Sequence, residues 1–360
     1  MSDGDGFAVS SVDLAKAVAS LFVAVDLPEP AAVIVANDLV RADVEGVASH
    51  GVMLVPMYIN RILAGSVSRQ DRGAIVSDRG GAVVVDGGNA LGQVTSHQAV
   101  NLVVERARQF GLAAVAVRNA FHFGMAGRYA RRIAEAGAIG MVMSNTRPMM
   151  PAPGGAEAMV GNNPIAIAVP SQGEYPVEVD MALSESAMGK IRLAKAAGQS
   201  IPQGWAVDRS GRPTTDAAAA IDGMLLPVAG PKGFGLAFVI DLLCGGLSSG
   251  GVGAAVRPLY GDASVPYNCS HAFIAIDVAH FTDQNAFATL VRDTAAVVSQ
   301  SRGAPGTERV FAPGELSYAK RQSAKSECRL SASTVSELVN IGHKIGIDLG
   351  ELFSQKDTSS

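Results

Sequence analysis

The chain has few cysteines and no long apolar run, and each of these shortages excludes a class of protein. Its three cysteines, Cys244, Cys269 and Cys328, are too few and too scattered for a disulfide framework or a zinc site. We interpret all three as reduced side chains without a chemical role, and we predict no metal site. The most apolar stretches are interrupted by Asp26 and by Asp241, so none reaches the ~18 residues that a membrane-spanning helix needs.

The charge pattern excludes two further classes. A formal net charge of −4 provides no basic surface for nucleic acid. The acidic start of the chain lacks the basic region and apolar run of a signal peptide, which predicts a cytoplasmic protein. With 360 residues, 48% of them apolar and 17% charged, the chain is typical of a compact globular protein of two or three domains.

Hydrophobic periodicity predicts helices at both ends of the chain and a mixed body between them. The predicted helices are Ser10 to Phe22, Pro30 to Asp43, Met53 to Ala64, Thr95 to Phe110, Met125 to Ala136, Phe234 to Leu247, Thr282 to Ser301 and Ser331 to Ile345. The predicted strands are Ala74 to Val76 with Ala82 to Val85 as a hairpin, then Leu112 to Val117, Ile139 to Met143, Pro164 to Val169, Val177 to Met181 and His271 to Ile276.

This order predicts a mixed α/β (α+β) fold with two parts. Residues 1–72 and 316–354 would form one helical domain from both chain ends, because each end alone has too little apolar surface to stand free. Residues 73–315 would form a mixed α/β domain.

The familiar nucleotide-binding motifs are missing. The strand predicted at Leu112 to Val117 is followed by Arg-Asn-Ala-Phe-His-Phe-Gly124 and not by G-x-G-x-x-G, which occurs nowhere in the chain. A Walker phosphate loop and a His-Glu-x-x-His motif are also missing. A dinucleotide would therefore need another arrangement.

The triplet Ser49-His50-Gly51 is the most informative motif. Histidine can give or take a proton near neutral pH. Ser49 could steady the imidazole of His50, and Gly51 lets the backbone turn and a ligand approach. Most histidines in proteins have no such role, so the triplet gains weight only from other segments that could share its pocket.

Those segments lie at turns and strand ends. They are His122–Gly124 at a strand-to-helix turn, Ser144–Pro148 after a strand, Gly161–Pro164 before one, Asp180 at a strand end and Gly230–Gly235 at the start of an apolar helix. The amides at a helix N-terminus favour an anion at the first and last of these.

Each segment also has a purely structural interpretation. His122 could be a satisfied turn histidine, Asp180 could cap a helix, and Gly230–Gly235 could be only a helix entry. Arg147 could be solvated, or it could bind a substrate carboxylate through two hydrogen bonds.

Taken in order, these motifs resemble the malate/L-lactate dehydrogenase family of the second type, whose fold is unrelated to the Rossmann dehydrogenases. The likeness runs from about residue 10 to residue 350. The matching segments are Ala42-Asp43, Ser49-His50-Gly51, Pro56-x-Tyr58, Asp86-Gly-Gly-Asn-x-x-Gly92, His122-Phe-Gly124, Ser144-Asn145, Pro153-Gly-Gly155, Gly161-x-Asn163-Pro164, Val179-Asp-Met-Ala182, Gly189-Lys190-Ile191, Pro202-x-Gly204-Trp205, Pro231-Lys-Gly-Phe-Gly-Leu236 and Pro313-Gly-Glu315.

The resemblance implies a homodimeric oxidoreductase that uses NAD or NADP in a non-Rossmann domain and acts on a 2-oxo or 2-hydroxy acid. It makes His50 the proton donor and acceptor, with Ser49 as its helper. It assigns the dinucleotide to His122, Phe123, Gly124, Met125, Ala126, Ser144, Asp180, Met181, Ala182, Lys232, Gly233, Pro313, Gly314 and Glu315.

Two positions depart from the family pattern and bear on the substrate. Leu54 stands where relatives usually carry an arginine that holds the substrate carboxylate, and Asn162 stands where they typically have threonine. Arg147 could supply the missing charge from another direction. Alternatively, the substrate has a less acidic or bulkier end that packs against Leu54, Met53 and Met149.

Other functions remain open at this stage. One branch of the family reduces cyclic imino acids such as piperideine-2-carboxylate, with an acidic residue near the position of Lys190, and the lysine here favours carbonyl chemistry. A protein that catalyses non-redox proton transfer is a further alternative, whereas a protein that only binds a small ligand or nucleotide would not need His50. A hydrolase with Ser49 as nucleophile lacks a third group to orient the histidine.

Overall fold

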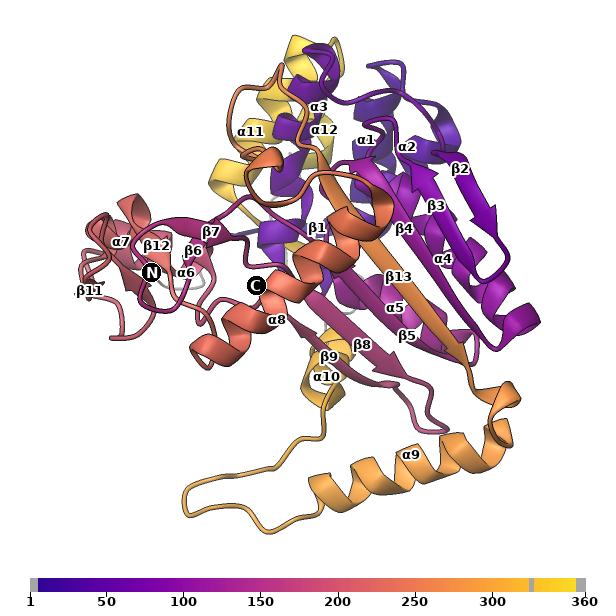
Figure 1. The fold of residues 1–360 in the computed structure, drawn as a ribbon. Coiled ribbons are helices and arrows are strands. Elements are labelled where there is room, and N and C mark those ends of the chain that lie inside the picture. The colour runs from indigo at the N-terminus through magenta and orange to yellow at the C-terminus, as the bar shows by residue number, and fades with distance from the viewer. Residues whose placement is uncertain (1–5, 324–326, 354–360) are drawn as a thin grey trace, which may run out of the picture.

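A twisted seven-stranded sheet forms the centre of the molecule (Figure 1). The computed structural model describes residues 6–323 and 327–353. The strand order is β2-β3-β4-β13-β5-β8-β9, in which β3 and β4 are parallel and the other neighbours are antiparallel. The strands are β2 (Ala74–Arg79), β3 (Ala82–Asp86), β4 (Leu112–Ala120), β5 (Ala138–Ser144), β8 (Ile165–Val169), β9 (Val177–Met181) and β13 (Cys269–Asp277).

Alternating side chains of this sheet contribute to two hydrophobic cores. Val142 and Phe273 belong to the core beneath α4 (Gly92–Phe110) and α5 (Ala126–Glu135). Their chain neighbours Met143 and Ala272 belong to the core beneath α8 (Pro231–Asp241). This period of two is the expected pattern for strands covered on both faces.

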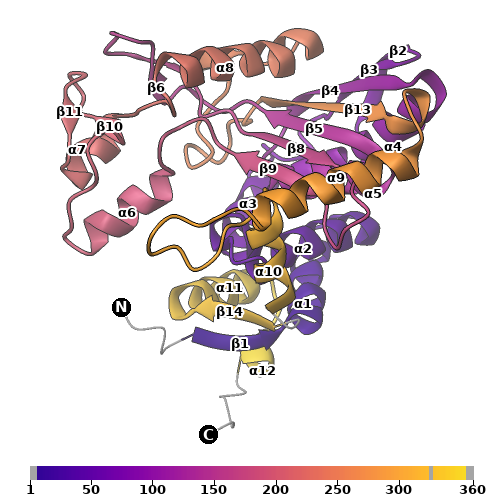
Figure 2. The same cartoon turned by 90° about the horizontal axis from the view of Figure 1, so that it is seen from below.

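The two chain ends meet in a second, smaller sheet that the sequence did not predict. β1 (Gly6–Ser10) pairs antiparallel with β14 (Glu327–Ser331), as Figure 2 shows. Around this pair lie the terminal helices α1 (Ser11–Val23), α2 (Glu29–Val44), α3 (Val55–Leu63), α10 (Glu315–Ser323), α11 (Ala332–Lys344) and α12 (Gly350–Phe353).

The two chain ends are thus in contact, and their core is continuous with the α4/α5 face of the central sheet. The domain division at residues 72/73 and 315/316 stays a prediction, and residues 1–5, 324–326 and 354 of those ranges lie outside the described part.

Apart from β8 and β9, the segment between β5 and α8 forms a lobe of short elements that hydrophobic periodicity did not predict. Two small sheets, β6-β7 and β11-β10-β12, and two short helices build it. Its elements are β6 (Met150–Pro151), β7 (Ala158–Val160), α6 (Met188–Ala196), β10 (Ala206–Val207), β11 (Pro213–Thr214), α7 (Ala217–Asp222) and β12 (Met224–Leu225).

After α8 a π-helical turn, Leu242–Gly246, continues the predicted helix, and α9 (Gln284–Ser299) starts at its cap Asp283.

The mixed α/β fold and the β2-β3 hairpin are confirmed. All three cysteines are free and buried. Within the described residues, no helix is both long and apolar enough to cross a membrane.

Candidate active site

The predicted segments gather at one edge of the central sheet. β4 and β5 both run antiparallel to β13, and β8 and β9 continue the antiparallel order, so β4, β5 and β9 end where β13 and β8 begin. The register pairs Ser144 with His271 and Met181 with Ile165. Segments far apart in the sequence therefore converge at this edge.

The turn that carries His50 reaches this edge from the terminal helices. His50 ends the 3₁₀ turn Ala48–His50, and its ring stacks on His122 with a centroid separation of 5.6 Å and an interplanar angle of 27°. Ser49 Oγ lies 3.0 Å from His50 Nδ1, so the two predicted residues are in contact. Burial lowers the pKa of His50, which favours the neutral imidazole.

A partly buried carboxylate holds that turn in place. Asp43 Oδ2 accepts a hydrogen bond from the Val52 amide at 2.7 Å. The carboxyl group lies directly against Gly51, where a β-carbon would overlap it. From the sequence we expected Gly51 to let the backbone turn and a ligand approach. The structure shows instead that the missing side chain of Gly51 makes room for the carboxylate of Asp43. Burial raises the pKa of Asp43 to about 7.

His122 is fixed by two residues that sequence reasoning did not assign. Tyr58 Oη lies 2.7 Å from His122 Nδ1, and Gln93 Nε2 donates to Tyr58 Oη at 3.1 Å. Burial, followed by the nearby imidazoles of His50 and His271, lowers the pKa of His122 to about 3. The segments Pro56-x-Tyr58 and Asp86 to Gly92 were the only signals that could have drawn attention to this pair of residues.

Asp180 caps α5, as its structural interpretation predicted. Its Oδ2 accepts from the Gly127 amide at 2.9 Å, and a β-carbon on Gly127 would lie 2.6 Å from the same oxygen. The surrounding protein desolvates this carboxylate and raises its pKa to about 6, although part of the residue stays exposed. The anion expected at the N-terminus of α5 is therefore one that the chain itself supplies.

The start of α8 differs from that of α5, because no side chain among the described residues caps it. Lys232 is exposed in the first turn, and Gly233 is buried where a β-carbon would overlap the Val228 carbonyl. Gly233 is thus required for packing, while Lys232 and the free N-terminal amides can meet an anion.

The Pro313–Glu315 segment links α9 to α10. Glu315 accepts hydrogen bonds from Ser299 Oγ at 2.7 Å and from the Ala312 amide at 2.9 Å, and it also pairs with Arg309. Pro313 is exposed, and Gly314 has a φ of +89° beside Glu178. The carboxylate of Glu315 therefore links the end of α9 to the segment that precedes α10.

The other residues predicted for the cofactor differ in exposure. Phe123 is buried and stacks on His271 at 4.3 Å, and Ser144 is buried with its Oγ on the Asn145 carbonyl. Those that keep some exposed surface are Gly124, Met125, Met181 and Ala182, whereas Ala126 is buried.

The three predicted substrate residues occupy different environments. Leu54 is only 1% exposed and packs in the core of the terminal helices. Arg147 is exposed, and its one hydrogen bond within the described structure is to the Pro148 carbonyl at 3.3 Å. Asn162 Oδ1 accepts from Thr146 Oγ1 at 3.0 Å, so its position beside the β5 end is fixed.

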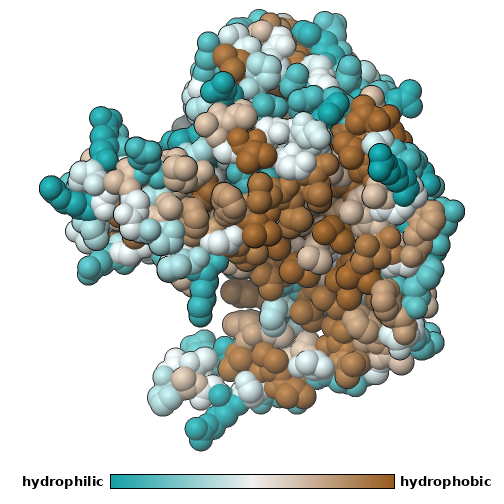
Figure 3. Space-filling view, viewed as in Figure 1, coloured by the Kyte–Doolittle hydropathy of each residue, from teal (hydrophilic) through white to brown (hydrophobic). Residues whose placement is uncertain are grey.

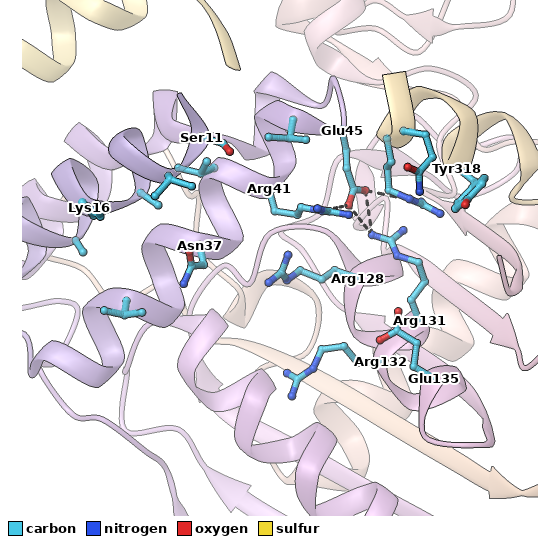
Figure 4. A pocket seen from close by; sticks show the side chains of 18 of the residues that line it. Ser11, Lys16, Asn37, Arg41, Glu45, Arg128, Arg131, Arg132, Glu135 and Tyr318 are labelled. Atoms are coloured by element: carbon cyan, nitrogen blue, oxygen red, sulfur yellow. Dashed lines mark hydrogen bonds and ion pairs between the residues drawn. The ribbon is translucent and has the colours of Figure 1, made fainter. Parts of the chain in front are cut away.

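A cavity of 1520 Å³ lies away from these residues, between α1, α2, α5 and α10 (Figure 4). At one side Arg131 bonds both carboxylate oxygens of Glu45 and of Glu178, and Arg321 joins Glu178 at 3.1 Å. These buried ion pairs tie α2, α5, β9 and α10 together. The cavity contains none of the residues predicted for catalysis.

Comparison with known proteins places the chain among dehydrogenases. The family model described as malate/L-lactate dehydrogenase matches residues 9–339. Malate dehydrogenase of Pyrococcus abyssi is 35% identical over 89% of this chain and 90% of its own length. The structure of sulfolactate dehydrogenase from Methanocaldococcus jannaschii matches 97% of this chain and 100% of its own with a TM-score of 0.91 and 32% identity.

Other relatives are named for different substrates and for different nicotinamide cofactors. Ureidoglycolate dehydrogenase (NAD(+)) of Escherichia coli is 34% identical over 81% of this chain and 83% of its own length. (2R)-3-sulfolactate dehydrogenase (NADP(+)) of Chromohalobacter salexigens is 38% identical over 74% and 80%. The structure of delta1-piperideine-2-carboxylate reductase from Pseudomonas syringae has a TM-score of 0.83 and 26% identity, over 92% of this chain and 99% of that one.

Proposed function

The chain belongs to the malate/L-lactate dehydrogenase family, and from this premise we propose that it is an NAD(P)-dependent oxidoreductase acting at C2 of a 2-oxo or 2-hydroxy acid. The observation that carries the proposal is the stacked pair of His50 and His122 at the sheet edge. Each imidazole has its Nδ1 in a hydrogen bond with a hydroxyl group, which leaves Nε2 for a ligand.

The residues at this edge fit a dinucleotide. The uncapped first turn of α8 and the exposed Lys232 supply positive potential for a diphosphate. Gly124 and Met125, which follow His122 in the chain, and Met181, at the end of β9, keep exposed surface. When bound, the nicotinamide ring supplies or accepts the hydride.

His50 moves the proton that accompanies the hydride. In the reducing direction its protonated imidazole gives that proton to the substrate oxygen as the C2–O double bond becomes single; in oxidation the neutral ring takes it back. The lowered pKa of His50 favours the base form, which suits oxidation. Ser49, at 3.0 Å from Nδ1, orients the ring, and Asp43 fixes the turn through Val52. General acid–base work of this kind contributes about 10²–10⁴-fold.

Arg147 is the cation we assign to the substrate carboxylate. Leu54 lies in the core and cannot contact a ligand as the structure stands. Arg147 follows the β5 end, is exposed and has no carboxylate partner in the described structure, so its guanidinium is available for a bidentate pair. Asn162, held by Thr146, would lie beside the same ligand.

The test is a turnover screen that follows NADH and NADPH absorbance with 2-oxo acids, cyclic imino acids and neutral analogues. We expect cofactor oxidation with one acid substrate, its loss in His50→Asn, and a raised KM with little change of kcat in Arg147→Ala. Binding of neither nucleotide would sink the proposal. Unchanged kinetics in Arg147→Ala would remove that residue from it.

Reduction of a cyclic imino acid is the second candidate, favoured by the likeness to the piperideine-2-carboxylate reductase structure. Lys190, at the position where we expected an acidic helper in that branch, is exposed on α6. The substrate panel decides between the two, since only an imine reductase would turn over the cyclic imino acids.

We also propose that the protein is a homodimer through the faces of α8 and α9. No residue of α9 is buried, and Leu290 and Val297 are 63% and 71% exposed. Phe238 on α8 and Leu242 in the π-helical turn that follows it are exposed as well. Figure 3 shows an extended apolar surface across this hollowed face. A second copy of the chain carries the same apolar surface, so a two-fold contact would cover both.

A further inference from the structure

Two residues from separate helices, Gln93 and Tyr58, form a hydrogen-bonded chain that ends at the imidazole of His122. Gln93 lies in the first turn of α4, Tyr58 in α3, and His122 in the turn between β4 and α5. Both Gln93 and Tyr58 are completely buried. α4 begins against the turn so closely that a β-carbon on Gly92 would lie 2.5 Å from the His122 carbonyl oxygen. The contact is therefore tightly constrained.

The direction of these hydrogen bonds determines where the proton of His122 sits. The amide nitrogen of Gln93 can only donate, so the Tyr58 oxygen accepts from it at 3.1 Å. Tyr58 has a single proton, and its near partner is His122 Nδ1 at 2.7 Å, against 3.5 Å for the His122 carbonyl. Nδ1 of His122 is thus an acceptor, and a neutral ring carries its proton on Nε2.

We propose that Gln93 and Tyr58 are positioning residues that hold His122 as its neutral Nε2–H form, which donates a hydrogen bond to the substrate's C2 oxygen while His50 exchanges the proton. The second half of this statement rests on the proposed function. Burial holds the pKa of His122 at about 3, so the ring stays a neutral donor at physiological pH. A neutral imidazole can polarise a carbonyl in this way without giving up its proton.

Imidazole nitrogen NMR on protein with ¹⁵N-labelled histidine tests the first half without any turnover. The six histidines are few enough to assign His122 by comparison with His122→Asn. We expect the wild-type protein to show a protonated Nε2 and a bare Nδ1. The opposite form in the wild type would overturn the proposal.

Gln93→Glu is the sharpest variant, because it keeps the size of the side chain and reverses the hydrogen bonds. The new carboxylate accepts from Tyr58, whose oxygen must then accept from Nδ1–H, so His122 should switch to its Nδ1–H form. Gln109→Glu places the same charge at the exposed end of the same helix and should leave the spectrum unchanged. If Gln93→Glu does not fold, Tyr58→Phe removes the donor, and both forms of the ring should then be populated.

Kinetics test the second half. With the switched ring we expect kcat to fall about 100-fold or more, the loss typical for one donor to a developing oxyanion, while the KM for the nicotinamide nucleotide stays unchanged. A switched spectrum with wild-type kcat would overturn the role assigned to His122. If the wild-type protein shows the Nε2–H form of His122 but oxidises or reduces no nicotinamide nucleotide, the proposed function is wrong. The positioning of His122 by Gln93 and Tyr58 would still stand.

Discussion

The carboxylate of Asp43 occupies the space that a β-carbon on Gly51 would need. The same carboxylate accepts the Val52 amide at 2.7 Å, so it supports the residues on the C-terminal side of His50. Gly51 has a φ of −93°, which every residue type can adopt, so steric overlap and not backbone conformation explains the glycine. The position of His50 depends on this contact between helix α2 and the turn.

Gly51→Ala should therefore displace the His50 turn. The added methyl group would overlap the partly buried carboxylate of Asp43. We expect a loss of about 1–3 kcal/mol in unfolding free energy together with a fall in kcat. Denaturant unfolding and steady-state kinetics measure the two effects. Gly189→Ala is the matched control, because nothing lies within 4 Å of a β-carbon there. Wild-type stability and kcat in Gly51→Ala would contradict the role of this contact.

The pKa of Asp43 predicts a pH-dependent stability difference for Asp43→Asn. Burial raises this pKa from 3.8 to about 7, so the folded state binds the proton more tightly than the unfolded chain does. The stabilisation from the protonated acid is complete below about pH 4 and is lost as the pH rises to about 7. Asparagine does not ionise and can still accept from Val52, so it escapes that loss.

We therefore expect the variant to gain about 2–4 kcal/mol relative to wild type between pH 4 and pH 7, measured by denaturant unfolding at each pH. Glu29→Gln, at an exposed carboxylate, is the control for removal of a charge. A difference between Asp43→Asn and wild type that does not change with pH would show that Asp43 titrates as it does in the unfolded chain.

Leu54→Arg should fail to restore the arginine of the family pattern. Leu54 is 1% exposed in the core, so a guanidinium there would be buried without a carboxylate, which costs several kcal/mol. We expect a sharply lowered Tm. Met53→Arg, at a neighbouring position that is 42% exposed, should keep wild-type stability. A stable Leu54→Arg protein with a lowered KM for 2-oxo acids would show instead that this position faces the substrate.

Long, regular segments could be predicted from the sequence, while short and non-local ones could not. The helical period of Leu14, Val18 and Leu21 and the apolar run of β4 reveal themselves within about ten residues. β1 and β14 lack such a signal, because each is five residues long and is stabilised by a partner more than 300 positions away. The two-residue strands of the lobe also depend on contacts that no local pattern contains.

The candidate site divides in the same way. Ser49, His50 and His122 were predicted from motifs, and the structure brings them together. Tyr58 and Gln93 were not, because a tyrosine and a glutamine inside helices resemble ordinary core residues until the fold places them behind His122. Leu54 was assigned to the substrate from its position in a motif, and only the packing of the terminal helices shows that it is buried.

Negative charge introduced on α9 should dissociate the proposed dimer. Leu290 and Val297 are large apolar side chains that water surrounds in a single chain, and a partner would desolvate them. Leu290→Glu with Val297→Glu would place two carboxylates in that contact, and burial of unpaired charge is unfavourable enough to prevent association. Light scattering after size exclusion should give twice the chain mass of 36.9 kDa for wild type and one chain mass for the double variant. Ala196→Glu, on an exposed helix face of the lobe, should stay dimeric. A monomeric wild type, or a dimer that survives both substitutions, would rule out this interface.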